Sequence, residues 1–402
     1  MPSSPVRSFF LIAGEPSGDF LGARLMRALQ ARGEAEGVEV RFRGIGGEKM
    51  RAAGLEVFFP QEDLAHVGLI EVLRHLPTLA RRLKATVAEV RREPPDALIT
   101  IDSPDFCLRV AKRLRKGGAP CPLVHYVAPS VWAWRPGRAK ALAGVLDHLM
   151  TVLPFEPPYF TREGLACTFV GHPLVESNAG KGRAERIFAR WPEAREGGPF
   201  VVVLPGSRRS EVARLEPIFR ATLAYLKTRY PTLKALVPTL GVVASAMEER
   251  TKTWPVPTLV VHGENAKYDA LAAGTVALAC SGTVSLELAL AGLPSVIAYK
   301  VHPLTALIAR RLIRCPFATL VNLMQGRAVM PELLQEKCTP HALAEAVAAL
   351  LDSPKARATQ REALADVAPW LGRDGPAPSV RAAEVVWGCV KRPLGGSLSV
   401  NP

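Results

Sequence analysis

An aspartate stands where a buried strand is expected to end in the first third of the chain. Asp102 follows the apolar residues 97–101, and Pro104 forces an abrupt turn two positions later. A carboxylate in such a partly desolvated position can remove a proton from a substrate hydroxyl, which is the task of a general base. We therefore predict that Asp102 is catalytic. The neighbouring Asp105 has a simpler interpretation as the cap of the following helix.

Residues that can bind phosphate lie just past the middle of the chain. Residues 204–209 (Leu-Pro-Gly-Ser-Arg-Arg) follow an apolar run that predicts a strand, and they precede a predicted helix. Ser207 and Arg208 would then stand beside backbone amides at a helix start, where a phosphate binds well. The alternative is a basic helix start that faces solvent, although cations are locally unfavourable there without an anion.

Residues 280–291 repeat this arrangement with a strand end, a Ser-Gly-Thr turn and an apolar helix. Ser281, Gly282 and Thr283 would present hydroxyls and unpaired amides to a pyrophosphate. Glu287, about one turn into the helix, has a carboxylate that can accept both hydroxyls of a ribose. A glutamate at this position can equally serve only to stabilise the helix start. The segment therefore predicts a pyrophosphate site, with the role of Glu287 open.

The segment 126–135 combines aromatic and basic side chains. Trp132 and Trp134 stand at alternate positions, and Arg135 follows them directly. Aromatic platforms with arginines suit sugars and phosphates, whereas buried aromatic residues more often supply packing area. Both interpretations of the tryptophans stay open at this point.

The chain lacks the motifs of the common metal and nucleotide-cofactor sites. It contains no Asp-x-Asp pair, no His-Glu-x-x-His and no P-loop sequence. Residues 44–49 approach a dinucleotide fingerprint, but Lys49 replaces its third glycine and the run does not follow the first strand of the chain. We therefore expect no metal and no other cofactor.

The formal net charge of +14 implies attraction to an anionic partner. Nucleic acid is disfavoured as that partner, because zinc-finger spacing, RNP motifs and basic runs with interleaved aromatic residues are all missing. The seven cysteines are scattered and predict reduced thiols. The apolar run at 9–13 is too short for a signal peptide, and no stretch reaches the roughly 18 to 20 apolar residues that span a bilayer. We expect a cytoplasmic protein.

The same order of predicted elements occurs at two places in the chain. Residues 8–19 and 199–209 each predict a buried strand, a glycine-containing turn and a helix start. Alternating strands and helices predict an α/β fold of two Rossmann-like domains, whose strand-end loops face each other across an interdomain cleft. The further predicted strands are 97–101 and 123–127 in the first sheet, and 235–237, 258–261, 276–279 and 295–299 in the second.

Residues 64–84 have the composition of a helix that lies at a membrane surface. They are mostly apolar, are interrupted at Pro77 and end in basic residues that suit anionic headgroups. A helix pair buried inside the first domain explains the composition equally well. A second apolar run with arginines covers 304–320. The predicted membrane-facing stripe consists of Val67, Ile70, Leu73 and Leu76.

Several of these segments resemble the lipid-A-disaccharide synthases, glycosyltransferases of the two-domain GT-B type. The resemblance implies an inverting transfer of 2,3-diacylglucosamine from its UDP ester to lipid X, which is 2,3-diacylglucosamine 1-phosphate. The products would be UDP and the lipid A disaccharide 1-phosphate. The matching motifs keep the order and spacing of the family across about residues 9–390. They are Gly-Glu-Pro-Ser-Gly-Asp at 14–19, Ile-Asp-Ser-Pro-Asp-Phe at 101–106, Pro-Ser-Val-Trp-Ala-Trp-Arg at 129–135, Leu-Pro-Phe-Glu at 153–156, Leu-Pro-Gly-Ser-Arg at 204–208 and Asn-Leu at 322–323.

The resemblance also assigns roles to residues of this chain. It implies that Asp102 is the base, Arg208 binds the pyrophosphate and Glu287 binds the ribose. This chain has Pro16 where other members have threonine. The donor side would comprise Ser207, Arg208, Ser281, Gly282, Thr283, Glu287 and Asn322. The acceptor side of the cleft would comprise Glu15, Ser17, Gly18, Asp19, His125, Ser130, Trp132 and Arg135.

The predicted domains are an acceptor-side domain over 1–173, a UDP-sugar-binding domain over 174–365 and a helical segment over 366–402. The resemblance implies that this last segment crosses back to the first domain or to that of a second subunit, which leaves a homodimer open. It also implies peripheral association with the inner face of the cytoplasmic membrane. Two alternatives remain: another GT-B enzyme that acts on a UDP-N-acetylhexosamine, and a non-catalytic peripheral lipid-binding protein.

Overall fold

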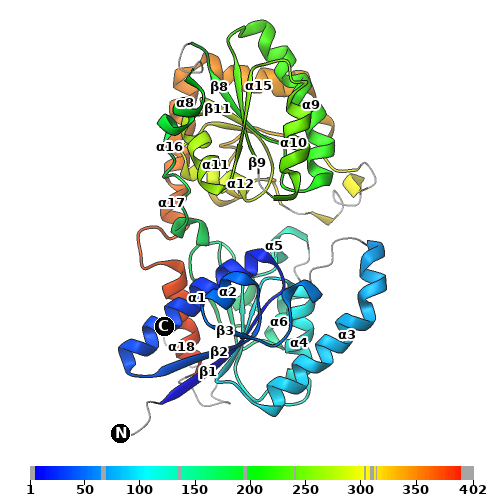
Figure 1. The fold of residues 1–402 in the computed structure, drawn as a ribbon, viewed down its shortest axis with the longest axis vertical. Coiled ribbons are helices and arrows are strands. Elements are labelled where there is room, and N and C mark those ends of the chain that lie inside the picture. Colours follow the sequence, from blue (N-terminus) through cyan, green and yellow to red (C-terminus); the bar gives the residue numbers. More distant parts are fainter. Residues whose placement is uncertain are drawn as a thin grey trace. The chain divides into compact units, whose positions relative to one another are not determined.

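The computed structural model describes residues 5–64, 69–134, 137–192, 197–239, 241–302, 305–307, 312–313 and 315–390, apart from the side chains of 69–76 and 242. The chain divides into two compact units (Figure 1). Unit 1 contains Met1–Pro173 and Gly372–Pro402, and unit 2 contains Leu174–Leu371. Each unit is built on a parallel sheet with helices, so the predicted α/β class with two Rossmann-like domains is confirmed.

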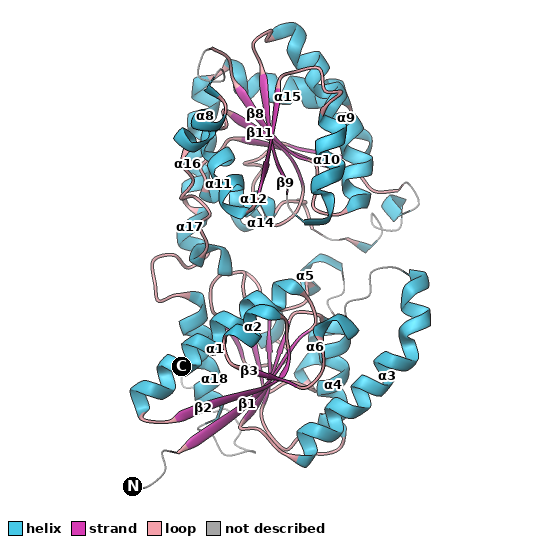
Figure 2. Ribbon diagram, in the orientation of Figure 1, coloured by secondary structure: helices cyan, strands magenta, loops and turns pink. Residues whose placement is uncertain are grey.

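The sheet of unit 1 has seven strands in the order β3-β2-β1-β4-β5-β6-β7 (Figure 2). In the parallel pairing of β1 with β4, Phe9 lies beside Ala97 and Ala13 beside Ile101, so these two strands end side by side. The strand order reverses between them, and ligands of open α/β sheets bind at such a switch point. The strands are β1 (Val6–Ala13), β2 (Glu39–Ile45), β3 (Leu55–Val57), β4 (Ala97–Ile101), β5 (Leu123–Tyr126), β6 (His148–Thr151) and β7 (Cys167–Phe169).

Helices pack on the sheet of unit 1. Phe10, Ile12 and Leu98 project from one face into a core shared with Val87 of α3 and Leu114 of α4. The C-terminal helix α18 packs on α1, where the buried Trp387 donates from Nε1 to Glu36 Oε2 at 3.0 Å. The helices are α1 (Pro16–Glu36), α2 (Glu48–Ala52), α3 (Leu69–Arg92), α4 (Pro104–Lys116), α5 (Val131–Trp134), α6 (Arg138–Ala143), α7 (Pro157–Thr161) and α18 (Pro378–Val390), with a 3₁₀ turn, η1 (Gln61–Asp63).

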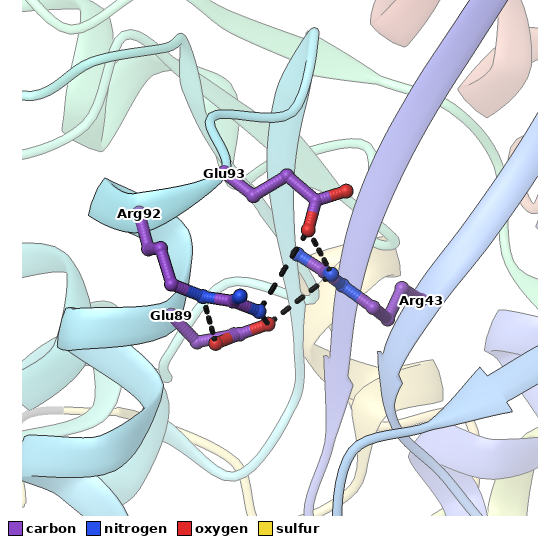
Figure 3. A network of polar contacts seen from close by, with 4 residues as sticks. All are labelled: Arg43, Glu89, Arg92 and Glu93. Carbon is purple, nitrogen blue, oxygen red and sulfur yellow. Dashed lines mark hydrogen bonds and ion pairs between the residues drawn. The ribbon is translucent and has the colours of Figure 1, made fainter.

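An ion-pair network ties the end of α3 to the sheet (Figure 3). Arg43 of β2 contacts Glu89 Oε1 at 3.1 Å and Glu93 Oε2 at 2.6 Å, and Arg92 also contacts Glu89 Oε1 at 2.6 Å. Pro77 lies inside α3, and the helix continues on both sides of it. A proline removes one backbone hydrogen bond, and the turns on either side of it keep theirs.

The sheet of unit 2 has six strands in the order β10-β9-β8-β11-β12-β13, which repeats the strand order of unit 1. Val201 and Val203 of β8 and Val276 and Leu278 of β11 enter one buried core with Phe219 of α9. The predicted strands are confirmed with changes of up to two residues at their ends. They are β8 (Phe200–Leu204), β9 (Lys234–Thr239), β10 (Thr258–His262), β11 (Val276–Cys280), β12 (Ser295–Tyr299) and, not predicted, β13 (Glu332–Leu334).

From α8 to α15, the described helices of unit 2 alternate with its strands along the chain. They are α8 (Ala184–Arg190), α9 (Arg209–Arg229), α10 (Ala244–Thr251), α11 (Glu264–Ala273), α12 (Val284–Leu290), α14 (Leu320–Gln325), α15 (Pro340–Asp352), α16 (Pro354–Ala365) and α17 (Val367–Trp370). Shorter 3₁₀ turns are η2 (Pro173–Glu176), η4 (Gly241–Val243) and η5 (Gln335–Lys337). Among the helices that the structure describes, none has the length and apolar character needed to cross a bilayer.

Candidate functional site

The turn after β4 presents Asp102 at the carboxyl end of the central strands of unit 1. Its backbone amide donates to Tyr126 O at 2.9 Å, which ties the turn to the end of β5. Asp102 and Ser103 have φ angles of 51° and 43°, a left-handed conformation that is costly for residues other than glycine. Asp102 is half-buried, as expected for a residue at a strand end. The carboxylate is therefore held at the switch point of the sheet by a strained turn.

The start of α1 contacts this turn directly. Ser17 Oγ donates to Asp102 Oδ2 at 2.9 Å, and Ser103 Oγ donates to Glu15 Oε1 at 3.3 Å. A side chain at Gly14 would clash with Ser103 Oγ, because a Cβ there would lie 2.6 Å from it. A Cβ at Gly18 would lie 3.2 Å from Ile101 O. The two glycines therefore allow the turns after β1 and β4 to meet, which brings Glu15, Ser17 and Asp102 together.

Asp19 has a structural position. Its side chain is buried and accepts hydrogen bonds from the amides of Gly47, Lys49 and Met50 at 2.8 to 3.0 Å. These are the unpaired donors at the start of α2, so Asp19 caps that helix from α1. Gln61, which the sequence did not single out, donates to Ala13 O at 3.0 Å and to Glu15 O at 2.8 Å. Both residues fix the loop that carries Glu15 and Ser17.

His125 lies inside the sheet of unit 1. Its side chain on β5 is fully buried, and Nδ1 lies 2.7 Å from Thr100 Oγ1 of β4. Burial lowers the pKa of His125 to about 4, because the charged imidazolium is poorly solvated there. Nε2 has no hydrogen-bond partner in the part of the chain that the structure describes. His125 therefore lies inside the fold of unit 1, with its ring shielded from solvent.

Trp132 is fixed by a buried carboxylate from the Leu-Pro-Phe-Glu motif. Its Nε1 donates to Glu156 Oε1 at 3.2 Å, and its ring meets Phe155 edge to face, with centroids 5.2 Å apart. Glu156 is 2% exposed, and burial raises its pKa to about 7. Ser130, in the same segment, is exposed, and Arg135 lies outside the described residues. The tryptophan is partly buried, which leaves both of its predicted roles open.

A pocket of about 390 Å³ in unit 2 collects the predicted phosphate-binding turns. The carboxyl ends of β8 and β11 lie next to each other, since Leu204 pairs with Ala279. The turns that follow these strands therefore face the same space. Of the predicted donor-side residues, all but Asn322 line this pocket, and they are Ser207, Arg208, Ser281, Gly282, Thr283 and Glu287.

Glu211 shapes the first of these turns. Its Oε2 accepts from the amides of Ser207 at 3.1 Å and Arg208 at 3.2 Å, and its Oε1 contacts Arg208 Nη1 at 3.4 Å. The Arg208 side chain is 80% exposed, so this contact contributes little to folding stability and leaves the guanidinium accessible to an anion. Glu211 stands three residues after the helix cap, as in a capping box, but the cap is Arg208 and not the serine or threonine of that motif, so the sequence did not mark Glu211.

Two further pocket residues were not anticipated from the sequence. Lys267 of α11 donates from Nζ to Glu287 Oε1 at 2.6 Å, so a cation holds the carboxylate predicted to bind a ribose. Thr239, at the end of β9, is 4% exposed, and its Oγ1 has no partner among the described residues. Buried hydroxyls are normally hydrogen-bonded, so this one is available to a ligand in the pocket.

Asn322 is fully buried and lies outside the pocket lining. Its Oδ1 accepts from the amides of Val329 and Met330, both at 2.9 Å, and its Nδ2 donates to Met330 O and Glu332 Oε1, both at 2.8 Å. Its side chain can make four hydrogen bonds and makes all of them within the protein. In this structure Asn322 is thus a positioning residue.

Glu332 connects Asn322 to the pocket. Its carboxylate also accepts from the amides of Ala318 at 2.8 Å and Thr319 at 2.9 Å. Ala318 O in turn accepts from Ser281 Oγ at 2.9 Å. A chain of hydrogen bonds therefore runs from Asn322 through Glu332 and Ala318 to the Ser-Gly-Thr turn. No local pattern marks Glu332 in the sequence, because its partners lie 10 to 14 residues away along the chain.

The predicted membrane-facing stripe lies outside the described part of the structure. Val67 is not described, and neither are the side chains of Ile70, Leu73 and Leu76 on α3. In the second apolar run, Leu307, Leu312 and Ile313 are 51%, 45% and 50% exposed. No group of three or more potential metal ligands is found among the residues that the structure describes.

The family model and the sequence relatives agree on one family. A family model described as lipid-A-disaccharide synthetase matches residues 9–369. The lipid-A-disaccharide synthase of Rhodospirillum centenum is 55% identical over 377 residues, which cover 94% of this chain and 93% of the relative. Among solved structures, the kitacinnamycin glycotransferase is similar with a TM-score of 0.60 at 16% identity, over 96% of this chain and 100% of that one. The UDP-GlcNAc 2-epimerase of Neisseria meningitidis has a TM-score of 0.56 at 10% identity, over 96% and 99%. The two structures share the fold alone.

Proposed function

The chain belongs to the lipid-A-disaccharide synthetase family and is a glycosyltransferase of lipid A biosynthesis, and from this premise we propose its substrates and the roles of its residues. The donor is UDP-2,3-diacylglucosamine, and the acceptor is 2,3-diacylglucosamine 1-phosphate. The sugar is transferred to the 6-hydroxyl of the acceptor with inversion. The products are the lipid A disaccharide 1-phosphate and UDP.

One observation carries the donor half of this proposal. The two turns that follow β8 and β11 line one pocket of about 390 Å³ together with Glu287. That volume lies within the roughly 300 to 1,000 Å³ of pockets that enclose small ligands. Arg208 neutralises the diphosphate, the Ser281 to Thr283 turn donates to its oxygens, and Glu287 Oε2 accepts from the ribose while Lys267 holds Oε1.

The acceptor half rests on Asp102. In the transfer, the 6-hydroxyl oxygen bonds to the anomeric carbon while the bond from that carbon to the UDP oxygen breaks. The hydroxyl proton passes to Asp102, and the electron pair of the broken bond leaves with UDP. Ser17 holds Oδ2 of Asp102 at 2.9 Å, which leaves Oδ1 to take the proton. Arg208 stabilises the charge that develops on UDP, so the reaction needs no divalent metal.

Both substrates carry acyl chains, so the enzyme must meet them at the bilayer. Each methylene buried in an apolar medium is stabilised by about 0.8 kcal/mol, so complete withdrawal of an acyl chain into water is prohibitive. The protein therefore docks on the anionic inner face of the cytoplasmic membrane. The docking surface is the stripe of Val67, Ile70, Leu73 and Leu76. The exposed Leu307, Leu312 and Ile313 are a second anchor.

UDP release by the purified protein tests the proposed function. With the acylated donor and the phosphorylated acceptor together, we expect UDP and a disaccharide phosphate in equal amounts, and neither substrate alone should release UDP. Turnover of a UDP-N-acetylhexosamine in preference to the acylated donor would identify a different GT-B enzyme. Binding of the acylated sugars without turnover would identify a lipid carrier.

A further inference from the structure

A small basic hollow lies in unit 1 between α4 and α6. It encloses about 140 Å³, less than the roughly 300 Å³ at the lower end of pockets that enclose a whole small ligand. Leu108 and Leu142 contribute apolar surface, and both belong to the buried core of the unit. Its charged lining residues are Asp105, Arg109 and Lys112 of α4 and Arg138 of α6. The hollow therefore suits one charged group and not a nucleotide.

The charge around the hollow is unbalanced. Within the described part of the chain, Arg109, Lys112 and Arg138 form no ion pair, and Asp105 is the single carboxylate in the lining. Further along α4, by contrast, Arg115 contacts Asp147 Oδ2 at 2.6 Å. Three cations and one carboxylate around one space leave an excess of positive charge, which favours an anion there. Arginine binds phosphate particularly well, because its planar guanidinium can donate two parallel hydrogen bonds.

The hollow lies next to the proposed base. Pro104 forms part of its lining, and Asp102 precedes Pro104 by two residues. Two residues of extended chain span at most about 7 Å, so the turn that carries Asp102 borders the hollow. An acceptor whose hydroxyl meets Asp102 can therefore place a second group, on the far side of one sugar ring, in the hollow.

We propose that this hollow binds the phosphate of the acceptor sugar, with Arg138 and Lys112 as its principal ligands. The proposal rests on the proposed function, because it names the part of unit 1 that recognises the charged end of the acceptor. The same chemistry fits the headgroup phosphate of an anionic lipid, and the experiment separates the two sources.

The test uses binding of the acceptor in the absence of donor, measured by calorimetry on the full-length protein. The double variant Arg138→Gln and Lys112→Gln should bind 2,3-diacylglucosamine 1-phosphate about tenfold or more weakly than the parent, since two charge-assisted contacts are lost. Binding of the same sugar without its phosphate should not change. Arg113→Gln removes an exposed cation of α4 that does not line the hollow, and it should leave both affinities within twofold.

The proposal would be overturned by an equal loss of affinity for the phosphorylated and unphosphorylated sugars, or by no loss for either. A double variant that keeps its acceptor affinity but binds phosphatidylglycerol vesicles more weakly, with phosphatidylcholine vesicles as the reference, would also overturn it, because the hollow would then bind a lipid headgroup. Since binding is measured without donor, an absence of turnover in the parent would count against the proposed function alone.

Discussion

The hydroxyl of Ser17, in the first turn of α1, donates to Oδ2 of Asp102 at the end of β4, across 2.9 Å. Hydrogen bonds to a charged group contribute about 1.5 to 3 kcal/mol, and in the proposed mechanism this one also orients the carboxylate toward the acceptor. We predict that Ser17→Ala lowers kcat about tenfold with little change in the KM for the donor. Ser17→Thr should retain most of the rate, because it keeps the hydroxyl. Full kcat in the alanine variant would show that Asp102 needs no such orientation.

Glu332 should matter for donor binding although it does not line the pocket. In Glu332→Gln an NH₂ group replaces one acceptor oxygen. This group cannot accept the hydrogen bonds that the carboxylate receives from the amides of Ala318 and Thr319. We expect weaker binding of UDP, by about tenfold, because Ala318 would no longer hold the Ser281 turn. Glu345→Gln, at an exposed position of α15, is the matched control. Unchanged UDP affinity in both variants would refute the positioning role.

Catalysis should not depend on a divalent metal. In the proposed mechanism Arg208 neutralises the leaving UDP, so Arg208→Gln should lower kcat by about 10² or more. The parent enzyme should keep its rate in excess EDTA. Loss of activity in the chelator, followed by recovery with magnesium or manganese, would contradict this prediction.

His125 should make the protein sensitive to acid. Its pKa is lowered to about 4 in the folded protein, from an ordinary value of 6.5. The unfolded chain therefore binds the extra proton first, and stability is lost as the pH falls from about 6.5 to about 4. At about 1.4 kcal/mol per pKa unit, this loss approaches about 3 kcal/mol. The free energy of unfolding of the parent and of His125→Gln can be measured with urea as a function of pH. Below pH 6.5 the parent should lose more stability than the variant. Parallel pH profiles of the two proteins would contradict the lowered pKa of His125.

The sequence predicted the parts of the fold that depend on local patterns. Apolar runs before turns that contain glycine or proline identified β1, β4, β8 and β11. The residues after β4, β8 and β11 include the candidate base and most of the donor pocket. The strands β3, β7 and β13 have three residues each, too few for a pattern, and they were missed. The longer β2 and β6 were not predicted either.

The residues that hold the site in place could not be predicted in the same way. The resemblance assigned Asp19 and Asn322 to ligand-facing groups, yet both have side chains occupied by hydrogen bonds within their own units. Glu332 and Lys267 act on residues that come near them only after folding. A motif match identifies residues that the site needs. It does not distinguish a residue that contacts a substrate from one that holds another residue in position.

The role of Asp102 as the general base is tested most directly by Asp102→Asn, assayed with both acylated substrates across the pH range. The variant keeps the size of the side chain and can still bond to Ser17, but it cannot take a proton from the 6-hydroxyl. Loss of a positioned base typically lowers the rate by about 10² to 10⁴, and we predict a fall in kcat of that size with unchanged UDP affinity and an intact fold. A variant with kcat within threefold of the parent at every pH would show that another group removes the proton.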